Sequence, residues 1–283
     1  MQRSRNRSYS NLPAWHADFP ARHPAFSVIA PAARELNGPS WPSLATLDHC
    51  LVRANIRNAR GAALRVIEAD GGNGTAAGYE SNIFEHGHVA VRFGSWHDVF
   101  NVLVWRTFPA AKAALNARHC AALIRDPGEA RRRGPVRDAL TLFDESGVII
   151  ASSDASLLEA IEAHRWKELF WTRRATLLRS LRVCVFGHAL YEKLLSPFLG
   201  LTGYAVMLEV EQSIIDAPFS AQIEALDALS RMAIEDPSRL SSPRDLQPFP
   251  LLGMPDWYRE TDQEAFYNDP GYFRPGRGGA VNA

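Results

Sequence analysis

The sequence has few cysteines, no excess charge of either sign and no long apolar run. Its three cysteines, Cys50, Cys120 and Cys184, lie far apart and form no CxxC pair. This spacing excludes a zinc site built from cysteines and argues against a disulfide framework. Lysine plus arginine number 31, as do aspartate plus glutamate, so the formal net charge is zero. Such a balance argues against a dedicated nucleic-acid-binding protein.

Two further absences concern location and chemistry. The apolar runs are too short for a transmembrane helix, and no apolar stretch follows the basic start MQRSRNRSYSNLP, as a secretory signal would require. We therefore expect a soluble, cytoplasmic protein with reduced cysteines and no membrane partner. No GxSxG motif occurs, which argues against a serine hydrolase of the α/β type.

What the chain does contain is enough apolar material for a substantial core. Hydrophobic residues make up 46% of its 283 residues, including 14 phenylalanines and 7 tryptophans. We expect a flexible basic segment over 1–24, in which Trp15 and Phe19 can still dock on the body. Residues 25–245 are expected to form one globular domain.

The C-terminal residues 246–283 are rich in proline, glycine and aromatic groups. Burial of aromatic side chains offsets the entropy lost on ordering. The composition therefore predicts an extended arm packed on the domain, with disordered last residues.

Apolar periodicity predicts a mixed fold dominated by helices. Helical spacing is found over residues 43–57, 156–164, 168–195 and 220–234. Alternation predicts strands over 137–143 and 204–210, and Asp144-Glu145-Ser146-Gly147 is typical of a hairpin turn before 148–150. The expected class is a helix-dominated α+β single domain with a small antiparallel β-sheet.

The most informative segment runs from Trp96 to His119. Ser95 is suited to cap a helix, with Asp98 at its third position, and Phe108-Pro109 ends that helix and starts the next. The first helix is apolar nearly all round, so its polar groups need partners.

Helical phasing places these polar groups on two faces. His97 and Asn101 share a face of the first helix, and Lys112, Asn116 and His119 share a face of the second. Two helices joined at a proline can bring such faces together around a pocket. A structural role, in which these side chains only satisfy neighbouring loops, is the alternative.

A second pair, His188 and Glu192, lies four residues apart on a predicted helix. The two side chains could hold a metal ion, or the carboxylate could orient the imidazole. The alternative is an ordinary surface pair. Asp138 lies on the predicted strand among leucines, where Arg137 or a histidine would be its partner.

His97-Asp98 resembles the dipeptide of HD-type metal phosphohydrolases. That family needs a further histidine on a separate helix, whereas His86 and His88 lie only about three helical turns upstream. The spacing departs from the family pattern.

The leading hypothesis is an enzyme of hydrolase type, with a divalent metal or an acid–base pair and an unknown small-molecule substrate. The expected catalytic residues are His97, Asp98, His188 and Glu192. Metal ligands are expected among His97, His119, His188 and Glu192, and imidazole with carboxylate suits zinc, iron or manganese better than calcium. Supporting residues are expected at Asn101, Lys112, Asn116, Arg137 and Asp138.

The competing hypothesis is a binding or structural module without catalysis. In it the polar helix faces form buried networks, and the aromatic arm or the arginine run 131–133 contacts a partner. Convergence of the histidines in one pocket would favour the enzyme.

The order of several segments resembles a bacterial family of uncharacterised proteins, the domain of unknown function DUF3025. The resemblance rests on YESNI (79–83), WHDVFNVLVWRTFPAAKAALN (96–116), RDALTLFDESG (137–147), WKELF (166–170), FGHALYEK (186–193), GLTG (200–203), LLGMPDWY (251–258) and FYNDPGYFRP (266–275). It covers nearly all of residues 25–275 and implies no catalytic residue.

Overall fold

The computed structural model describes residues 14–69, 75–125 and 134–276. The expectations for the start of the basic segment, for the arginine run and for the last residues concern positions outside these ranges. The helices are α1 Ala30–Ala33, α2 Leu44–Arg53, α3 Ala76–His86, α4 Trp96–Thr107, α5 Pro109–Arg125, α6 Pro135–Ser146, α7 Ala155–Glu162, α8 Arg174–Ser180, α9 His188–Leu194, α10 Gln212–Ile215 and α11 Phe219–Glu235. The strands are β1 Arg65–Glu68, β2 His88–Val91, β3 Gly147–Ser152, β4 Leu181–Val185, β5 Thr202–Glu209 and β6 Gln247–Pro250.

Two small sheets lie among the helices, so the helix-dominated α+β class is confirmed. Strands β1 and β2 form a parallel pair, and the larger sheet has the order β4-β3-β5-β6. Its central pair, β3 and β5, is parallel, whereas both outer pairs are antiparallel. The larger sheet is thus mixed and not antiparallel as expected. Every residue of β3 is buried, which is typical of a strand covered on both faces.

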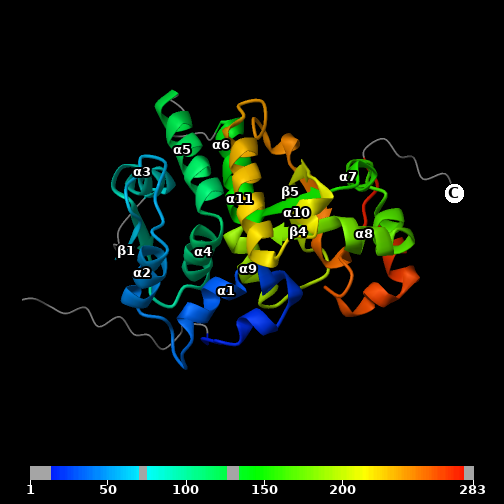
Figure 1. The fold of residues 1–283 in the computed structure, drawn as a ribbon, viewed down its shortest axis with the longest axis horizontal. Coiled ribbons are helices and arrows are strands. Elements are labelled where there is room, and N and C mark those ends of the chain that lie inside the picture. The colour runs from blue at the N-terminus through cyan, green and yellow to red at the C-terminus, as the bar shows by residue number, and fades with distance from the viewer. Residues whose placement is uncertain (1–13, 70–74, 126–133, 277–283) are drawn as a thin grey trace, which may run out of the picture.

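The elements are arranged along the long axis of the molecule (Figure 1). The β1–β2 sheet lies with α2 and α3 at one end, and the larger sheet lies with the C-terminal segment toward the other. Helices α4, α5, α6 and α9 stand between them and pack on one another. None of the described helices is long and apolar enough to cross a lipid bilayer.

The predicted strand at 137–143 and its hairpin are wrong, because this segment is helix α6. Pro135 takes the first helical position, and the buried residues Ala139, Leu140 and Phe143 recur at helical spacing. Gly147 begins β3 and closes no hairpin turn. Asp144 and Glu145 therefore belong to the last turn of a helix.

The long helix predicted over 168–195 is also wrong. The segment contains a π-helical turn at Glu168–Thr172, then α8, β4 and α9. Two valines within β4 favour a strand, and β4 pairs along β3. The other predicted elements are confirmed as α2, α7, β5 and α11. Ser43 and Asp154 cap α2 and α7 by accepting hydrogen bonds from the first turns of these helices.

The N-terminal and C-terminal segments both pack through aromatic rings. Trp15 stacks on Trp96 with ring centroids 4.6 Å apart, and Phe19 is buried against Phe100. Near the other end, β6 joins the larger sheet and short 3-10 helices follow, at Leu251–Gly253, Arg259–Asp262 and Glu264–Asn268. Phe170, Phe249, Tyr267 and Phe273 pack together there.

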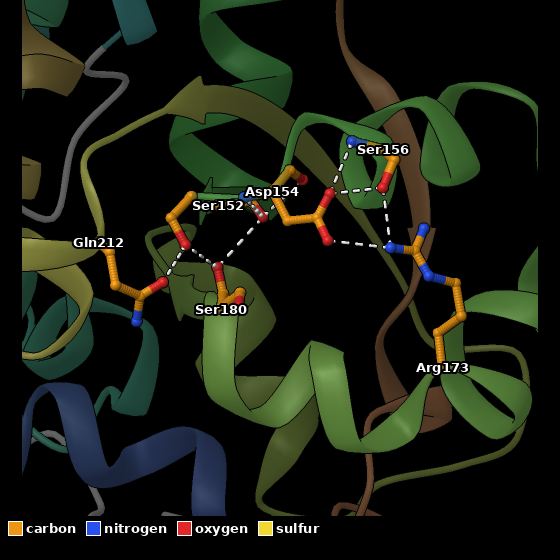
Figure 2. A network of polar contacts seen from close by, with 7 residues as sticks. Ser152, Asp154, Ser156, Arg173, Ser180 and Gln212 are labelled. Atoms are coloured by element: carbon orange, nitrogen blue, oxygen red, sulfur yellow. Dashed lines mark hydrogen bonds and ion pairs between the residues drawn. The ribbon is translucent and has the colours of Figure 1, made fainter.

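A network of hydroxyl and carboxyl groups joins the end of β3 to α7 and α8 (Figure 2). Ser152 donates to the carbonyls of Asp154 and Ser180 at 2.9 and 3.1 Å. Asp154 caps α7 and pairs with Arg173 at 2.9 Å. Within the described ranges its partners include serines, Asp154, Arg173 and backbone carbonyls, and no histidine takes part. The network therefore serves the fold.

Gly187 allows α9 to approach the end of α6. A Cβ atom at this position would lie 2.5 Å from three backbone atoms, the Glu145 oxygen and the Ser146 and Gly147 nitrogens. Gly187→Ala should therefore lower the free energy of unfolding by about 1–3 kcal/mol. Urea denaturation followed by circular dichroism would measure this loss. Gly38→Ala is the control, because nothing lies within 4 Å of its Cβ position, and equal stability of the two variants would contradict the prediction.

Asp227 of α11 caps the start of α5 from a distance. Its carboxylate accepts hydrogen bonds from the backbone nitrogens of Ala110 at 3.0 Å and Ala111 at 2.8 Å, and the residue is buried. Asp227→Ala leaves both N–H groups without this acceptor and should cost about 1–2 kcal/mol of unfolding free energy. The exposed Glu224 lies on the same helix, so Glu224→Ala should have almost no effect in the same urea titration.

Candidate metal centre

A cavity of about 1000 Å³ lies among α3, the β1–β2 sheet, α4, α5, α6 and the start of α9. Small side chains such as Ala76, Ala77 and Ala90 form part of its wall. Polar and charged groups line much of the rest, namely Glu68, Tyr79, Glu80, Arg92, His97, Asp98, Asn101, His119, Arg137, Thr141, Asp144, Glu145 and His188. The cavity is large enough for a small organic molecule.

Two imidazoles meet at this cavity. His97 is the second residue of α4 and His188 is the first residue of α9. Their Nε2 atoms lie 3.0 Å apart, and the ring planes are inclined at 75°. The two nitrogens can therefore either share one proton in a hydrogen bond or bind the same ion.

Glu145, in the last turn of α6, adds a carboxylate to this pair. Its Oε1 lies 3.8 Å from His188 Nε2, and one ligand atom of each of the three residues lies within 4.8 Å of the others. Two imidazoles with one carboxylate suit zinc and related transition metals. Three protein ligands beside a cavity leave coordination positions open for water or substrate.

Each histidine has a second carboxylate near its other ring nitrogen. Glu192 Oε2 lies 3.4 Å from His97 Nδ1, and Asp144 Oδ2 lies 3.7 Å from His188 Nδ1. In metal sites a carboxylate hydrogen-bonded to the second ring nitrogen fixes the tautomer and orientation of the histidine. Here both contacts are longer than ordinary hydrogen bonds, and His188 Nδ1 has no hydrogen-bond partner among the described residues, so each carboxylate contributes its charge beside the ring.

The charge on Asp144 is compensated inside the protein. Burial alone would disfavour its ionised form, but Lys112 Nζ lies 2.5 Å from Oδ1, and the pKa of Asp144 is lowered. The Lys112 ammonium also lies 5.3 Å from the ring centroid of Trp105. Burial lowers the pKa of His188 to about 3, so this imidazole is neutral at physiological pH and keeps a lone pair for a metal. Burial raises the pKa of Glu145.

Two neighbouring residues of α3, Tyr79 and Glu80, accept hydrogen bonds from asparagines on α4 and α5. Asn116 Nδ2 donates to Glu80 Oε2 at 2.6 Å and to the Glu80 carbonyl at 2.9 Å. Asn101 Nδ2 donates to the Tyr79 hydroxyl at 2.7 Å. Burial, with the nearby Asp144 carboxylate, raises the pKa of Glu80 to about 7.

The structure brings several of the residues expected from sequence into this one region. His97, His188 and Glu192 lie together, and Asn101 lines the same cavity. Lys112 and Asn116 are buried behind it. His119 lines the cavity from α5, but its ring is not part of the donor cluster found among the described residues.

Three further expected site residues lie outside the donor cluster, although Asp98 and Arg137 line the same cavity. Asp98 accepts two hydrogen bonds from the Arg92 guanidinium, at 2.7 and 2.8 Å, and joins β2 to α4. Arg137 lines the cavity from the first turn of α6. Asp138 lies in the same turn, where a carboxylate favours the helix dipole, and is not among the lining residues.

Sequence reasoning missed Glu145, Asp144, Glu80 and Tyr79. The sequence pattern predicts a turn at Glu145 and Asp144 because it predicts a strand where α6 lies. Pro135 followed by helical spacing was the signal that would have placed Asp144 and Glu145 at a helix end. Tyr79 and Glu80 had no such signal, since their role depends on contacts with α4 and α5.

Comparisons with known proteins give a family and no assigned activity. Residues 64–277 match the family model described as "Protein of unknown function (DUF3025)". Searches of curated proteins and of solved structures returned no significant match. The family match spans most of the chain and confirms the resemblance inferred from its segments. The chain belongs to the DUF3025 family.

Proposed function

We propose that this protein is a metal-dependent hydrolase, whose divalent ion is bound by His97, His188 and Glu145. The observation that carries the proposal is the orientation of the two imidazoles. Their Nε2 atoms are 3.0 Å apart at a cavity, and a carboxylate lies near each Nδ1. A carboxylate beside the second ring nitrogen is a common feature of metal-binding histidines.

The proposed ion would supply the nucleophile. A zinc-type ion lowers the pKa of bound water to about 7, so that hydroxide forms near neutral pH. The cavity gives a substrate access to the open coordination positions. The protein contributes the ligands, their orientation and a partly buried setting in which the charge of the ion is weakly screened.

A second candidate is a non-catalytic polar network. It has one observation in its favour, since 3.0 Å is also the length of an ordinary hydrogen bond between a neutral imidazole N–H and an imidazole nitrogen. In this alternative the histidines join α4 to α9 and no ion binds. Metal analysis separates the two candidates.

We also propose a cytoplasmic location. All three cysteines are free, and they are buried. Burial raises the pKa of each thiol to about 12, which makes them inert core residues. Unpaired cysteines are typical of proteins that fold in a reducing compartment.

Zinc stoichiometry tests the metal site. The purified protein, reconstituted with zinc and analysed by plasma mass spectrometry, should retain about one ion per chain, as a structural or catalytic site does. His97→Ala and His188→Ala should retain almost none, since each removes a ligand. The exposed His86 lies outside the cavity lining, so His86→Ala is the matched control. Wild-type protein without stoichiometric zinc, iron or manganese after reconstitution would overturn the proposal in favour of the polar network.

The carboxylate behind His188 should tune metal affinity. Asp144→Asn removes the charge that faces Nδ1 and should weaken zinc binding about 10-fold to 100-fold, measured by competition with a chelator. Asp138→Asn changes the same residue type on the same helix outside the cavity and should leave affinity unchanged. Circular dichroism checks that both variants are folded. Equal affinities for the two variants would show that Asp144 does not support the centre.

A further inference from the structure

Tyr79 and Asn101 join α3 to α4 at the wall of the cavity. Asn101 follows His97 by four residues on α4, so the two side chains share a face and lie about 5–6 Å apart at their Cβ atoms. The Asn101 amide reaches the Tyr79 hydroxyl at 2.7 Å. All three residues line the cavity together with His188 and Glu145. The hydroxyl is thus held near the candidate metal centre.

The hydrogen bond from Asn101 determines what the hydroxyl can do. Asn101 Nδ2 donates, so the Tyr79 oxygen is the acceptor and its own proton is free for another partner. Within the described residues, Tyr79 has no acceptor for this proton. Asn101 is buried, with 6% of its surface exposed, and therefore holds the hydroxyl in a defined position.

We propose that the Tyr79 hydroxyl is a catalytic hydrogen-bond donor to the substrate oxygen that becomes negatively charged during hydrolysis. This inference rests on the proposed function. The substrate class is a carbonyl or phosphoryl compound, because such a centre develops an oxyanion when hydroxide adds. Preorganised donors at that oxygen are among the strongest contributions to catalysis. Burial, with the Glu80 and Asp144 carboxylates, raises the pKa of Tyr79 well above its usual value, which keeps the donor protonated.

Tyr79 is chemically unchanged by the proposed reaction step. An ion held by His97, His188 and Glu145 would supply hydroxide, whose oxygen would form a bond to the carbon or phosphorus of the substrate while an electron pair moved to the substrate oxygen. The Tyr79 O–H donates a hydrogen bond to that oxygen and keeps its proton. The electron pair then returns, and the bond to the leaving group breaks. The leaving group departs with its electron pair and takes a proton from water.

Binding of oxyanion ligands to the zinc-loaded full-length protein tests the inference without a known substrate. Acetohydroxamic acid places a carbonyl-type oxygen on zinc, and inorganic phosphate places a phosphoryl oxygen there. We expect wild-type protein to bind at least one of them in isothermal titration calorimetry, and the preferred probe indicates the substrate class. Tyr79→Phe should weaken that probe about 10-fold to 100-fold, the loss expected for a hydrogen bond to a charged group, with zinc stoichiometry unchanged.

Asn101→Asp is a second variant, which keeps the Tyr79 hydroxyl but changes the direction of its hydrogen bond. The carboxylate would accept the Tyr79 proton and turn it away from the ligand, so the loss should match that of Tyr79→Phe. Tyr204, a partly buried tyrosine on β5 outside the cavity lining, gives the control Tyr204→Phe with unchanged binding.

Each contrary outcome has a distinct meaning. Unchanged probe affinity in Tyr79→Phe or in Asn101→Asp overturns the donor role and leaves the metal site intact. Zinc loss in Tyr79→Phe also overturns it, since the residue would then be structural. Failure of both probes to bind zinc-loaded wild type overturns it as well. Absence of zinc from wild type overturns the proposed function, and this inference with it.

Discussion

Lys112 and Asp144 form an ion pair whose side chains are only 5% and 13% exposed, so water solvates these charges weakly. Removal of either partner destabilises the fold, because the remaining charge is then left uncompensated. The pair joins α5 to α6, and the other oxygen of Asp144 faces His188 on α9. One carboxylate therefore lies where three helices meet. His188 and Glu145 stand at the same meeting point.

The close approach at Gly187 completes this arrangement. Without a side chain there, the α9 backbone comes against the end of α6, and the Gly187 nitrogen donates to the Gly147 carbonyl at 2.9 Å. His188 is the next residue, so its ring enters the protein beside Glu145. A residue without a side chain thus permits the close approach that brings the His188 imidazole to the Glu145 carboxylate. Core packing of this kind tolerates little adjustment, since neighbouring backbone atoms cannot move independently.

Much of the site could be predicted because helical phase is a local property. His97 with Asn101, and His188 with Glu192, share faces through spacing alone, and proline and serine marked the ends of α4 correctly. Glu145 is missed because alternation at Arg137 to Phe143 imitates a strand and outweighs the helix signal of Pro135, while the helix is stabilised by tertiary burial of Ala139, Leu140 and Phe143. The sequence favours His119 as a ligand and does not point to Glu145 for a related reason. Which histidine faces another depends on how α5, α6 and α9 pack, and spacing within one helix carries no such information.

The donors of the candidate centre come from three distant parts of the chain. His97 and His188 alone are separated by 91 residues, and Glu145 lies on a third helix between them. An ion held by all three would therefore act as a cross-link, one that closes two long loops of the unfolded chain only when the native packing exists. Its binding free energy would add to the stability of the whole fold by mass action. Availability of metal would then control how much of this protein is folded, quite apart from how fast it turns over a substrate.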